Sequence, residues 1–376
     1  MPLRDPEEYI SWLSLKSVPG IGNRTFKRLL IHCGSPENVF ATPIEELVER
    51  RLVSQIVAAG IVKLKDSAWA REEIKEVKRR GLRLVSFADD AYPHYLRCIP
   101  DPPPVLYVHG TLSPAGQASI AIVGTRNPTQ YGLDMTKELA SGLAKQGFLI
   151  VSGMARGIDT AAHKWTLESS GKTLAVLGCG LGTVYPAENK ALFHRIGETG
   201  AVVSEFPVAA SPEPHHFPIR NRVISGISLG SIVVEASAKS GSLITAQYAL
   251  EQGRTVFSVP GSVRSVKSAG THKLIKQGGV LIERVEDVLM ELEPLASRKS
   301  LVFEANNEPA ERIRHDLSHF EREALNLLAP YPMHIDAIIR NLSLDAGQVL
   351  GILLQLEIKG LVEQTPGKYF ARAQFE

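Results

Sequence analysis

Two stretches decide the fold, Ile120–Arg126 (IAIVGTR) and Phe148–Gly157 (FLIVSGMARG). Each begins with a run of aliphatic residues and ends in a glycine-containing turn. Similar runs begin near residues 173, 201, 232, 255 and 279, so apolar segments recur every 23 to 31 residues. Strands covered on both faces have such continuous apolar sequences, and parallel strands need crossovers of this length. The pattern predicts an α/β domain with a Rossmann-like, doubly wound and mainly parallel sheet.

The flanks of this domain have a different pattern, because their apolar residues recur at helical spacing. We expect a helical N-terminal domain over residues 1–80, with Asn23 as the N-cap of its second helix, and the Rossmann-like domain over 81–293. A polar linker is predicted over 294–315. Three short helices and a hairpin predict a winged-helix domain over 316–376.

Composition excludes several classes of protein. The 376 residues carry 42 lysines and arginines against 40 aspartates and glutamates, so a polycationic nucleic-acid coat is excluded. The three cysteines, Cys33, Cys98 and Cys179, are far apart, which excludes a disulfide scaffold and a cysteine-rich zinc site. No apolar run approaches the ~20 residues that span a bilayer. We expect a cytoplasmic protein that does not enter a membrane.

Turns rich in glycine and serine follow almost every predicted strand of the sheet. The turns after parallel strands share one edge, which is where α/β proteins bind ligands. Glycine lets backbone N–H groups approach an anion, and helix N-termini add positive charge. Basic residues for phosphates and aromatic residues for stacking follow these turns; they are Arg126, Lys190, Arg220, Arg222, Tyr185, Phe206 and Phe217. The sequence predicts a crevice for a polyanion.

The crevice lacks the signatures of a nucleotide-cofactor enzyme. Gly124–Pro128 (GTRNP) is not the GxGxxG turn of dinucleotide-binding folds, and the second strand ends in Ser152 and Gly153 instead of an acidic residue. No GxxxxGK[ST], HExxH or GxSxG sequence occurs. We therefore expect phosphate binding without redox chemistry, and neither a cofactor nor a metal.

Several titratable residues have structural interpretations. We expect Asp159 to cap the helix after Gly157, His163 to lie on a helix face, and Cys179 to be a small buried residue. Glu205 and Glu235 are candidates for a carboxylate pair whose separation the sequence leaves open.

The turn Pro19–Gly22 (PGIG) between two predicted helices is typical of a helix-hairpin-helix. Its amides are suited to a nucleic-acid phosphate, and Arg24, Lys27 and Arg28 follow on the next helix. Packing or protein contact is an equally good interpretation of this turn.

Motifs in order over residues 82–285 resemble the DNA-processing protein A (DprA/Smf) family. They include Val123–Arg126, Ser152–Asp159 (SGMARGID), Ser204–Pro207, Phe217–Ile224 (FPIRNRVI) and Val259–Gly261. The flanks are similar to the SAM-like or helix-hairpin-helix-like N-terminal domain and the winged-helix C-terminal domain of many members. One departure is His272, where the family pattern has asparagine.

The resemblance implies a non-catalytic single-stranded-DNA-binding protein of DNA uptake (natural transformation) and homologous recombination. Such proteins protect incoming single strands, form homodimers through the Rossmann-like domain and promote loading of the RecA recombinase. Carried over position by position, the resemblance assigns the DNA pocket to Gly124, Thr125, Arg126, Gly153, Gly157, Lys190, Phe217, Arg220, Asn221 and Arg222.

Two other classes of function remain alternatives. One is a phosphoribohydrolase-like enzyme acting on a nucleoside monophosphate in a Rossmann-like crevice, although Ser240–Thr245 lacks the paired glycines of such enzymes. The other is a transcription regulator that uses the winged helix. The predicted third helix of that domain, Ala346–Lys359, is mostly apolar and has one lysine, so it favours a protein-interaction or structural role.

Overall fold

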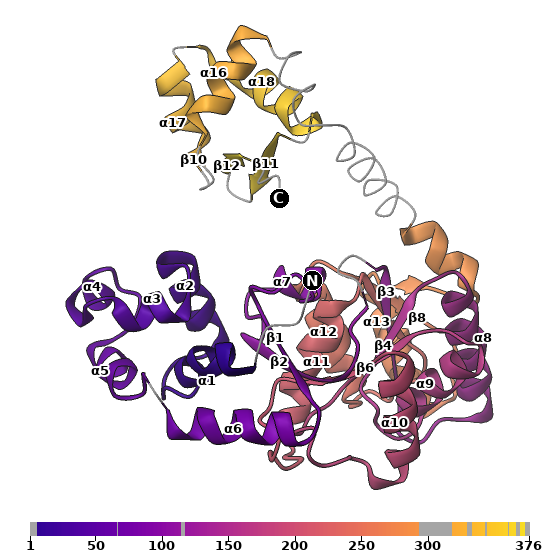
Figure 1. Ribbon diagram of the computed structural model, residues 1–376. Helices are drawn as coiled ribbons and strands as arrows, with labels where there is room; N and C mark the ends of the chain where they lie inside the picture. Colours follow the sequence, from indigo (N-terminus) through magenta and orange to yellow (C-terminus); the bar gives the residue numbers. More distant parts are fainter. Residues whose placement is uncertain are drawn as a thin grey trace. The chain divides into compact units, whose positions relative to one another are not determined.

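The structure, a computed structural model, describes residues 6–65, 67–113, 117–292, 318–328, 333–342, 344–359, 361–365 and 369–372 (Figure 1). The chain divides into two compact units, residues 1–289 and 290–376. The linker predicted over 294–315 lies outside the described residues.

A nine-stranded sheet organises the first unit, in the order β1-β2-β6-β5-β4-β3-β7-β8-β9. The seven neighbouring strands β6-β5-β4-β3-β7-β8-β9 are all parallel to one another. Strand β2 is antiparallel to both of its neighbours, β1 and β6. The predicted Rossmann-like, mainly parallel sheet is confirmed. The strands are β1 Arg83–Ser86, β2 Val105–Gly110, β3 Ser119–Val123, β4 Leu149–Ser152, β5 Thr173–Val176, β6 Ala201–Ser204, β7 Gly230–Val233, β8 Thr255–Ser258 and β9 Val280–Leu281.

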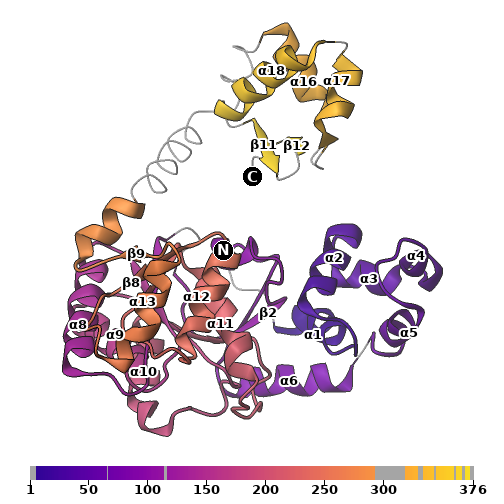
Figure 2. The same ribbon diagram turned by 180° about the vertical axis from the view of Figure 1, so that it is seen from behind.

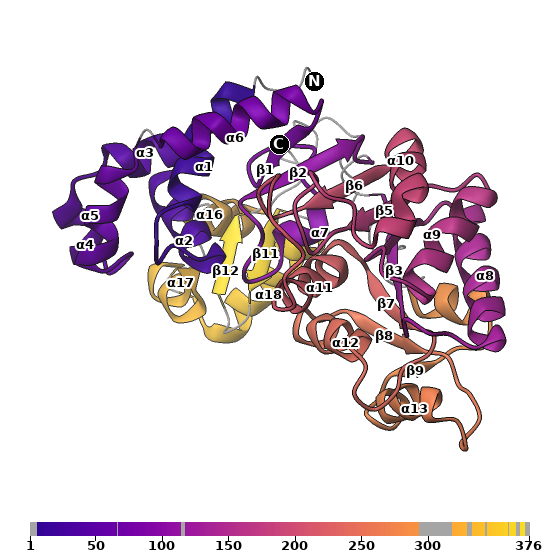
Figure 3. The ribbon, with the colours of Figure 1, turned by 90° about the horizontal axis from the view of Figure 1, so that it is seen from below.

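Helices cover both faces of this sheet. Figure 3 shows α8, α9 and α10 on one face, with α11 and α12 on the other. Every residue of β3 to β7 is therefore buried, which explains their continuous apolar sequences. The helices are α7 His94–Arg97, α8 Gln130–Lys145, α9 Ile158–Glu168, η2 Ala187–Asn189, α10 Lys190–Thr199, α11 His216–Ile227, α12 Ser242–Glu251, η3 Val266–Ser268 and α13 Ala269–Lys276.

The switch point of the topology lies between β3 and β7. From β3 the chain builds outward through β4, β5 and β6, and then returns past β3 to build β7, β8 and β9 on its other side. The loops after β3 and β7 consequently diverge to opposite faces of the sheet. Such a divergence opens a crevice at the carboxyl ends of the two strands.

The N-terminal helices group at the β1–β2 edge of the sheet, with α1 and α6 next to these strands (Figures 1 and 2). One hydrophobic core continues from these helices into the sheet, through residues such as Leu13, Leu29, Tyr107 and Val202. The helices are η1 Pro6–Tyr9, α1 Ile10–Lys16, α2 Asn23–Cys33, α3 Pro36–Ala41, α4 Ile44–Glu49, α5 Gln55–Lys63 and α6 Ala68–Arg79.

Apolar residues at helical spacing in Tyr9–Leu15, Thr25–Leu30, Ile44–Leu47 and Ala68–Val77 predict α1, α2, α4 and α6, but not α3 or α5. In α3 the apolar residues Val39, Phe40 and Ala41 are consecutive, so they show no helical spacing. Helix α5 has apolar residues all round, and Ile56 and Val62 on its outer side are 87 % and 57 % exposed. An apolar face is visible in a sequence only when the opposite face is polar.

The predicted N-cap role of Asn23 is wrong. Gly22 occupies the N-cap position of α2, and Asn23 is the first helical residue. The Asn23 side chain instead donates through Nδ2 to Glu205 Oε2 at 3.2 Å. The local sequence pattern predicts that the Asn23 side chain caps α2, but in the fold it binds Glu205, which is 182 residues away in the sequence.

The second unit has the winged-helix arrangement that the sequence predicts. Its core contains Leu325, Ile338, Leu353 and Phe370, and its three-stranded sheet has the order β10-β12-β11. The short strand β10 was not predicted. The elements are α16 His319–Leu327, β10 Met333–His334, α17 Ile335–Leu342, α18 Ala346–Ile358, β11 Val362–Thr365 and β12 Tyr369–Arg372.

Among the described residues, no single helix has the length and apolar composition to cross a bilayer. The bent pair Ile335–Leu342 and Ala346–Glu357 meets those two criteria only when combined.

Candidate functional site

A cleft of about 600 Å³ opens at the switch point of the sheet. Its walls are the loop after β3, the loop after β7 with the first turn of α12, and α11. Four prolines and serines of the flanking loops, Pro212, Pro214, Ser237 and Ser240, complete the rim. The cleft therefore lies where the topology predicts a ligand site.

A smaller pocket of about 40 Å³ adjoins the cleft, over the ends of β4 and β5. Its floor contains Gly153, Gly178 and Cys179, and it shares Arg126, Tyr185, Phe217 and Arg220 with the larger cleft. Arg126, Arg156 and Arg220 thus line one pocket. Arginine binds phosphates through planar, bidentate contacts, so this clustering suits a phosphate-bearing ligand.

Arg220 is the buried member of this group. It is 5 % exposed and donates through Nη1 to the carbonyl oxygens of Gly153, at 2.6 Å, and Val176, at 2.5 Å. Gly153 is required here because a Cβ atom would lie 2.3 Å from Arg220 Nη1. Burial lowers the pKa of Arg220, and the nearby Asp159 carboxylate opposes that shift.

Asp159 does not cap α9 as predicted. Gly157 is the N-cap, and Asp159, the second helical residue, accepts from the backbone N–H of Ala155 at 3.4 Å. Burial raises its pKa, and Arg220 is the main opposing charge. The carboxylate therefore closes the loop between β4 and α9 and compensates Arg220 beneath the cleft.

Glu235 fixes the loop that carries Arg126. Its carboxylate accepts from the Thr129 backbone N–H at 2.9 Å and from the Thr129 hydroxyl at 2.5 Å, and Thr129 is the N-cap of α8. Its carbonyl oxygen accepts from the Thr125 N–H at 2.8 Å. These contacts tie the loop between β3 and α8 to the segment after β7, on both sides of Arg126 in the sequence.

Aromatic rings line the cleft beside these arginines. The Arg126 guanidinium lies 5.7 Å from the Phe217 ring centre, and the Tyr185 ring lies 5.7 Å from that of Phe217 at an angle of 45°. Tyr185 is 42 % exposed, which leaves ring surface for a base. Phe206, the third stacking candidate, packs on His216 at 4.1 Å and does not line the cleft.

Seven of the ten predicted site residues line the two pockets. They are Gly124, Thr125, Arg126, Gly153, Phe217, Arg220 and Asn221. Lys190 is exposed at the start of α10, and Gly157 lies behind the Arg126 loop. Arg222 is 4 % exposed and forms ion pairs with Glu205 and Asp101. These three lie outside the lining of both pockets.

The two glutamates considered as a carboxylate pair are far apart. Glu205 follows β6 and Glu235 follows β7, and three strands separate β6 from β7. At about 4.8 Å per strand this places them roughly 19 Å apart. They do not form a catalytic pair.

Sequence reasoning left Arg156 and the first turn of α12 out of the assigned site. Arg156 borders the small pocket and is paired with Glu188, to which its Nη2 donates at 3.3 Å. Ser240 and Ser242 line the large cleft at the N-terminus of α12. The available signal for this segment was its place in the loop between β7 and α12, because the loops after parallel strands lie at the ligand-binding edge.

Two of the three basic residues after the helix-hairpin-helix-like turn, Lys27 and Arg28, bind carbonyl oxygens within the protein, and Arg24 is exposed. Lys27 Nζ donates to the Ile99 carbonyl oxygen at 3.0 Å, and Arg28 Nη2 donates to that of Leu52 at 2.5 Å. These contacts favour packing over nucleic-acid contact for this turn.

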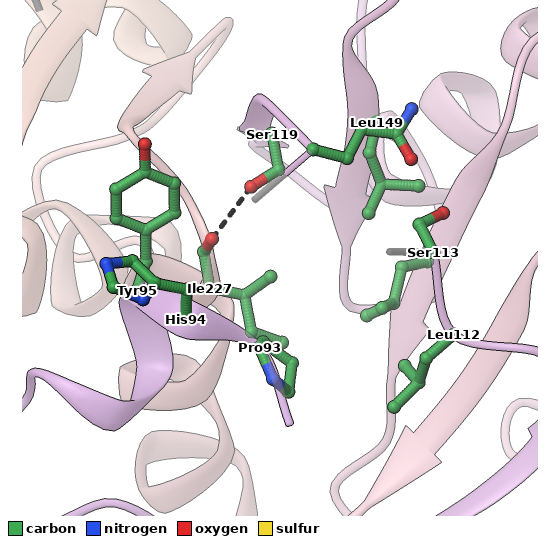
Figure 4. A pocket seen from close by; sticks show the side chains of 10 residues that line it. Pro93, His94, Tyr95, Leu112, Ser113, Ser119, Leu149 and Ile227 are labelled. Atoms are coloured by element: carbon green, nitrogen blue, oxygen red, sulfur yellow. Dashed lines mark hydrogen bonds between the residues drawn. The ribbon is translucent and has the colours of Figure 1, made fainter. Parts of the chain in front are cut away.

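A pocket at the opposite edge of the sheet gives a contrast (Figure 4). It measures about 30 Å³, and the Ser119 hydroxyl on its wall donates to the Ile227 carbonyl oxygen at 2.7 Å. Tyr95, His94 and Leu112 are among its lining residues, and none of those residues is lysine or arginine. The arginines Arg126, Arg156 and Arg220 therefore distinguish the pocket at the carboxyl edge from this one.

The buried His163, on α9 beneath the site, should make the free energy of unfolding depend on pH. The Thr173 hydroxyl donates to the Ile150 carbonyl oxygen, so it accepts from His163 Nδ1 at 2.6 Å. Burial lowers the pKa of His163 from 6.5 to about 3. The unfolded chain therefore binds the proton first, and His163 makes the free energy of unfolding fall between pH 6.5 and 3, by up to about 1.4 kcal/mol per pH unit.

The measurement is denaturant unfolding across this pH range. His163→Gln keeps a donor for Thr173 and removes the titration, so its unfolding free energy should fall less steeply on acidification. Equal slopes for the two proteins would contradict the assignment.

Comparison with known proteins places this architecture. The family described as DNA recombination-mediator protein A matches residues 83–293, and the DprA winged helix domain matches residues 308–368. The chain is 35 % identical to Protein Smf of Synechocystis sp., over 97 % of this chain and 99 % of that protein. It is 39 % identical to DNA processing protein DprA of Bacillus subtilis, over 68 % of this chain and 86 % of that protein.

Solved structures agree with these matches. DNA processing protein A of Streptococcus pneumoniae superimposes with a TM-score of 0.65 at 34 % identity, over 77 % of this chain and 99 % of that one. DNA processing protein A of Helicobacter pylori, a structure described for its single-stranded DNA binding mode, has a TM-score of 0.50 at 29 % identity, over 56 % and 96 %.

Proposed function

Because this chain belongs to the DNA recombination-mediator protein A family, we propose that it binds single-stranded DNA in DNA uptake and homologous recombination, without catalysing a reaction. The observation that carries the proposal is that Arg126, Arg156, Arg220 and the exposed Tyr185 all line the smaller pocket beside the cleft. Single-strand binders combine basic groups for the backbone with aromatic faces for the bases.

The proposal divides the cleft by chemistry. The arginines and the N–H groups at the start of α12 receive phosphates, and Tyr185 and Phe217 receive a base. Gly124, Thr125 and Gly153 line the pockets, Gly157 supports the Arg126 loop from behind, and Asn221 extends the wall. Lys190 lies outside the pockets and is proposed to contact the strand where it leaves them.

Protection of incoming strands, promotion of RecA loading and homodimer formation are finer proposals that rest on family membership. In the described part of the chain β9 is the edge strand of the sheet, and this edge supports the proposed dimer face. Leu281 on β9 and Val263 and Val266 in the preceding connection are 46 %, 88 % and 75 % exposed. Covering such apolar residues is the usual role of a second copy.

Salt dependence tests the proposed function. Fluorescence anisotropy with a single-stranded oligonucleotide, its duplex and a mononucleotide at 50 and 200 mM salt should show tightest binding to the single strand. Each phosphate contact releases counterions, so about three contacts should weaken that binding roughly 20-fold over this salt range. An affinity independent of salt, or tightest for the mononucleotide, would contradict it.

The phosphoribohydrolase alternative lacks an available acid in this site. Asp159 is the only carboxylate among the described residues that line the two pockets, and it is buried against Arg220. Release of adenine from AMP by the purified protein would nevertheless establish that activity.

A further inference from the structure

Glu205 and Arg222 form a buried ion pair behind the wall of the cleft. Glu205 follows β6, Arg222 belongs to α11, and the two are 8 % and 4 % exposed. Arg222 donates through Nη2 to Glu205 Oε2 and through Nη1 to the Asp101 carbonyl oxygen, the latter at 2.6 Å. Neither residue lines the cleft, so the pair acts on the protein and not on the ligand.

The element that the pair holds is the helix that builds the cleft wall. Phe217, Arg220 and Asn221 of α11 line the cleft, and Arg222 is the next residue. Successive helical residues are rotated by about 100° around the axis, so Arg222 leaves the helix in another direction than Asn221. Fixing Arg222 therefore fixes the rotation of α11, and with it the positions of the cleft residues.

The N-terminal helices bind the same glutamate. Asn23, at the start of α2, donates to Glu205 Oε2 at 3.2 Å, which is the oxygen that also accepts from Arg222. Lys16, at the end of α1, donates to the Glu205 carbonyl oxygen at 2.5 Å. A shift of the α1–α2 turn would consequently move the carboxylate that orients Arg222.

We propose that Lys16, Asn23, Glu205 and Arg222 are positioning residues that couple the N-terminal helices to the affinity of the cleft for single-stranded DNA. The inference rests on the proposed function. It gives the N-terminal helices a role in binding that needs no direct contact between them and DNA. A protein that binds the α1–α2 turn would change the affinity of the cleft for DNA through these four residues.

Glu205→Gln is the decisive variant, because two explanations predict opposite signs. The substitution removes a negative charge and keeps the size of the side chain and an acceptor oxygen. Long-range electrostatics alone would tighten binding to a polyanion. Loss of positioning should instead weaken binding, by about fivefold or more. The measurement is anisotropy of a labelled single-stranded oligonucleotide well below the unfolding temperature; unchanged or tighter binding overturns the proposal.

A milder variant keeps the test valid if Glu205→Gln fails to fold. Asn23→Ala removes one hydrogen bond and should weaken binding severalfold with little change in thermal stability. Asn38→Ala is the matched control, because it removes a bond of 2.8 Å to the Cys33 carbonyl oxygen inside the N-terminal helices. Its affinity should equal that of the unsubstituted chain; equal affinities for all three proteins overturn the proposal.

The double variant Asn23→Ala/Glu205→Gln distinguishes coupling between these two residues from a general loss of protein stability. In the Glu205→Gln background, Asn23→Ala should have little further effect, because both act through one carboxylate. Fully additive losses contradict the coupling. If the unsubstituted chain binds no single-stranded DNA, the proposed function fails and this inference with it; if that chain binds and the variants do not differ from it, only this inference fails.

Discussion

Arg126→Glu is expected to weaken binding to single-stranded DNA by about two orders of magnitude while leaving the fold intact. Arg126 is exposed and borders both pockets, so charge reversal removes a phosphate partner and places a repelling carboxylate in its position. Stability should be preserved because the loop is held by Glu235 and Thr129 and not by the arginine side chain. Gel-shift titration measures the effect, and circular dichroism checks the fold.

Lys172→Glu is the control for this variant. Lys172 is exposed and directly precedes β5, at the amino edge of the sheet, and its substitution changes the net charge by the same amount. Binding should change by less than about threefold, since exposed charges beyond the Debye length of roughly 10 Å are screened. Similar losses in the two variants would show that overall charge, and not the cleft, controls binding.

Gly157→Ala is expected to have the second large effect, a loss of about 3 kcal/mol in the free energy of unfolding together with weaker DNA binding. Gly157 has φ +78° and ψ −124°, a conformation that is open essentially to glycine alone. A Cβ atom there would lie 2.3 Å from the Thr125 carbonyl oxygen and 2.7 Å from the Arg126 carbonyl carbon. These are backbone atoms, so relief of the overlap must move the loop that presents Arg126.

Gly147→Ala isolates the contribution of this overlap. Gly147 also has a positive φ, +85°, but a Cβ atom there meets no other atom within 4 Å. Its substitution should cost only the left-handed conformation, about 1 to 2 kcal/mol, and should leave DNA affinity unchanged. Urea unfolding followed by tryptophan fluorescence compares the two. Equal stability losses, or normal DNA binding by Gly157→Ala, would contradict the assigned role.

The local sequence pattern identified the strands that are buried on both faces. Strands β3 to β7 are buried on both faces, so their apolar runs report their environment directly. The positions of Gly124, Arg126 and Gly153 after such strands were sufficient to place them at one edge. Helix α5 escaped detection because its exposed Ile56 gives it no polar face.

Long-range partners decided the residues that pattern misjudged. Asn23 has the chemistry of an N-cap and Arg222 that of a phosphate ligand, and both bind Glu205 instead. Glu235 was a candidate for a carboxylate pair with Glu205, but three strands separate the two residues and the Glu235 carboxylate binds Thr129. A side chain binds whichever partner the fold brings within hydrogen-bond distance, and those partners are 106 to 182 residues away for Glu235 and Asn23.

The sequence by itself determined that a parallel sheet collects glycine turns and basic residues at one edge, because strand direction follows from crossover length and apolar runs from burial. Only the tertiary structure decided which arginines face the ligand. Arg220 and Arg222 are two residues apart on α11, and the first borders the cleft while the second is neutralised by Glu205. The rotation of a helix against its sheet separates them, and packing sets that rotation.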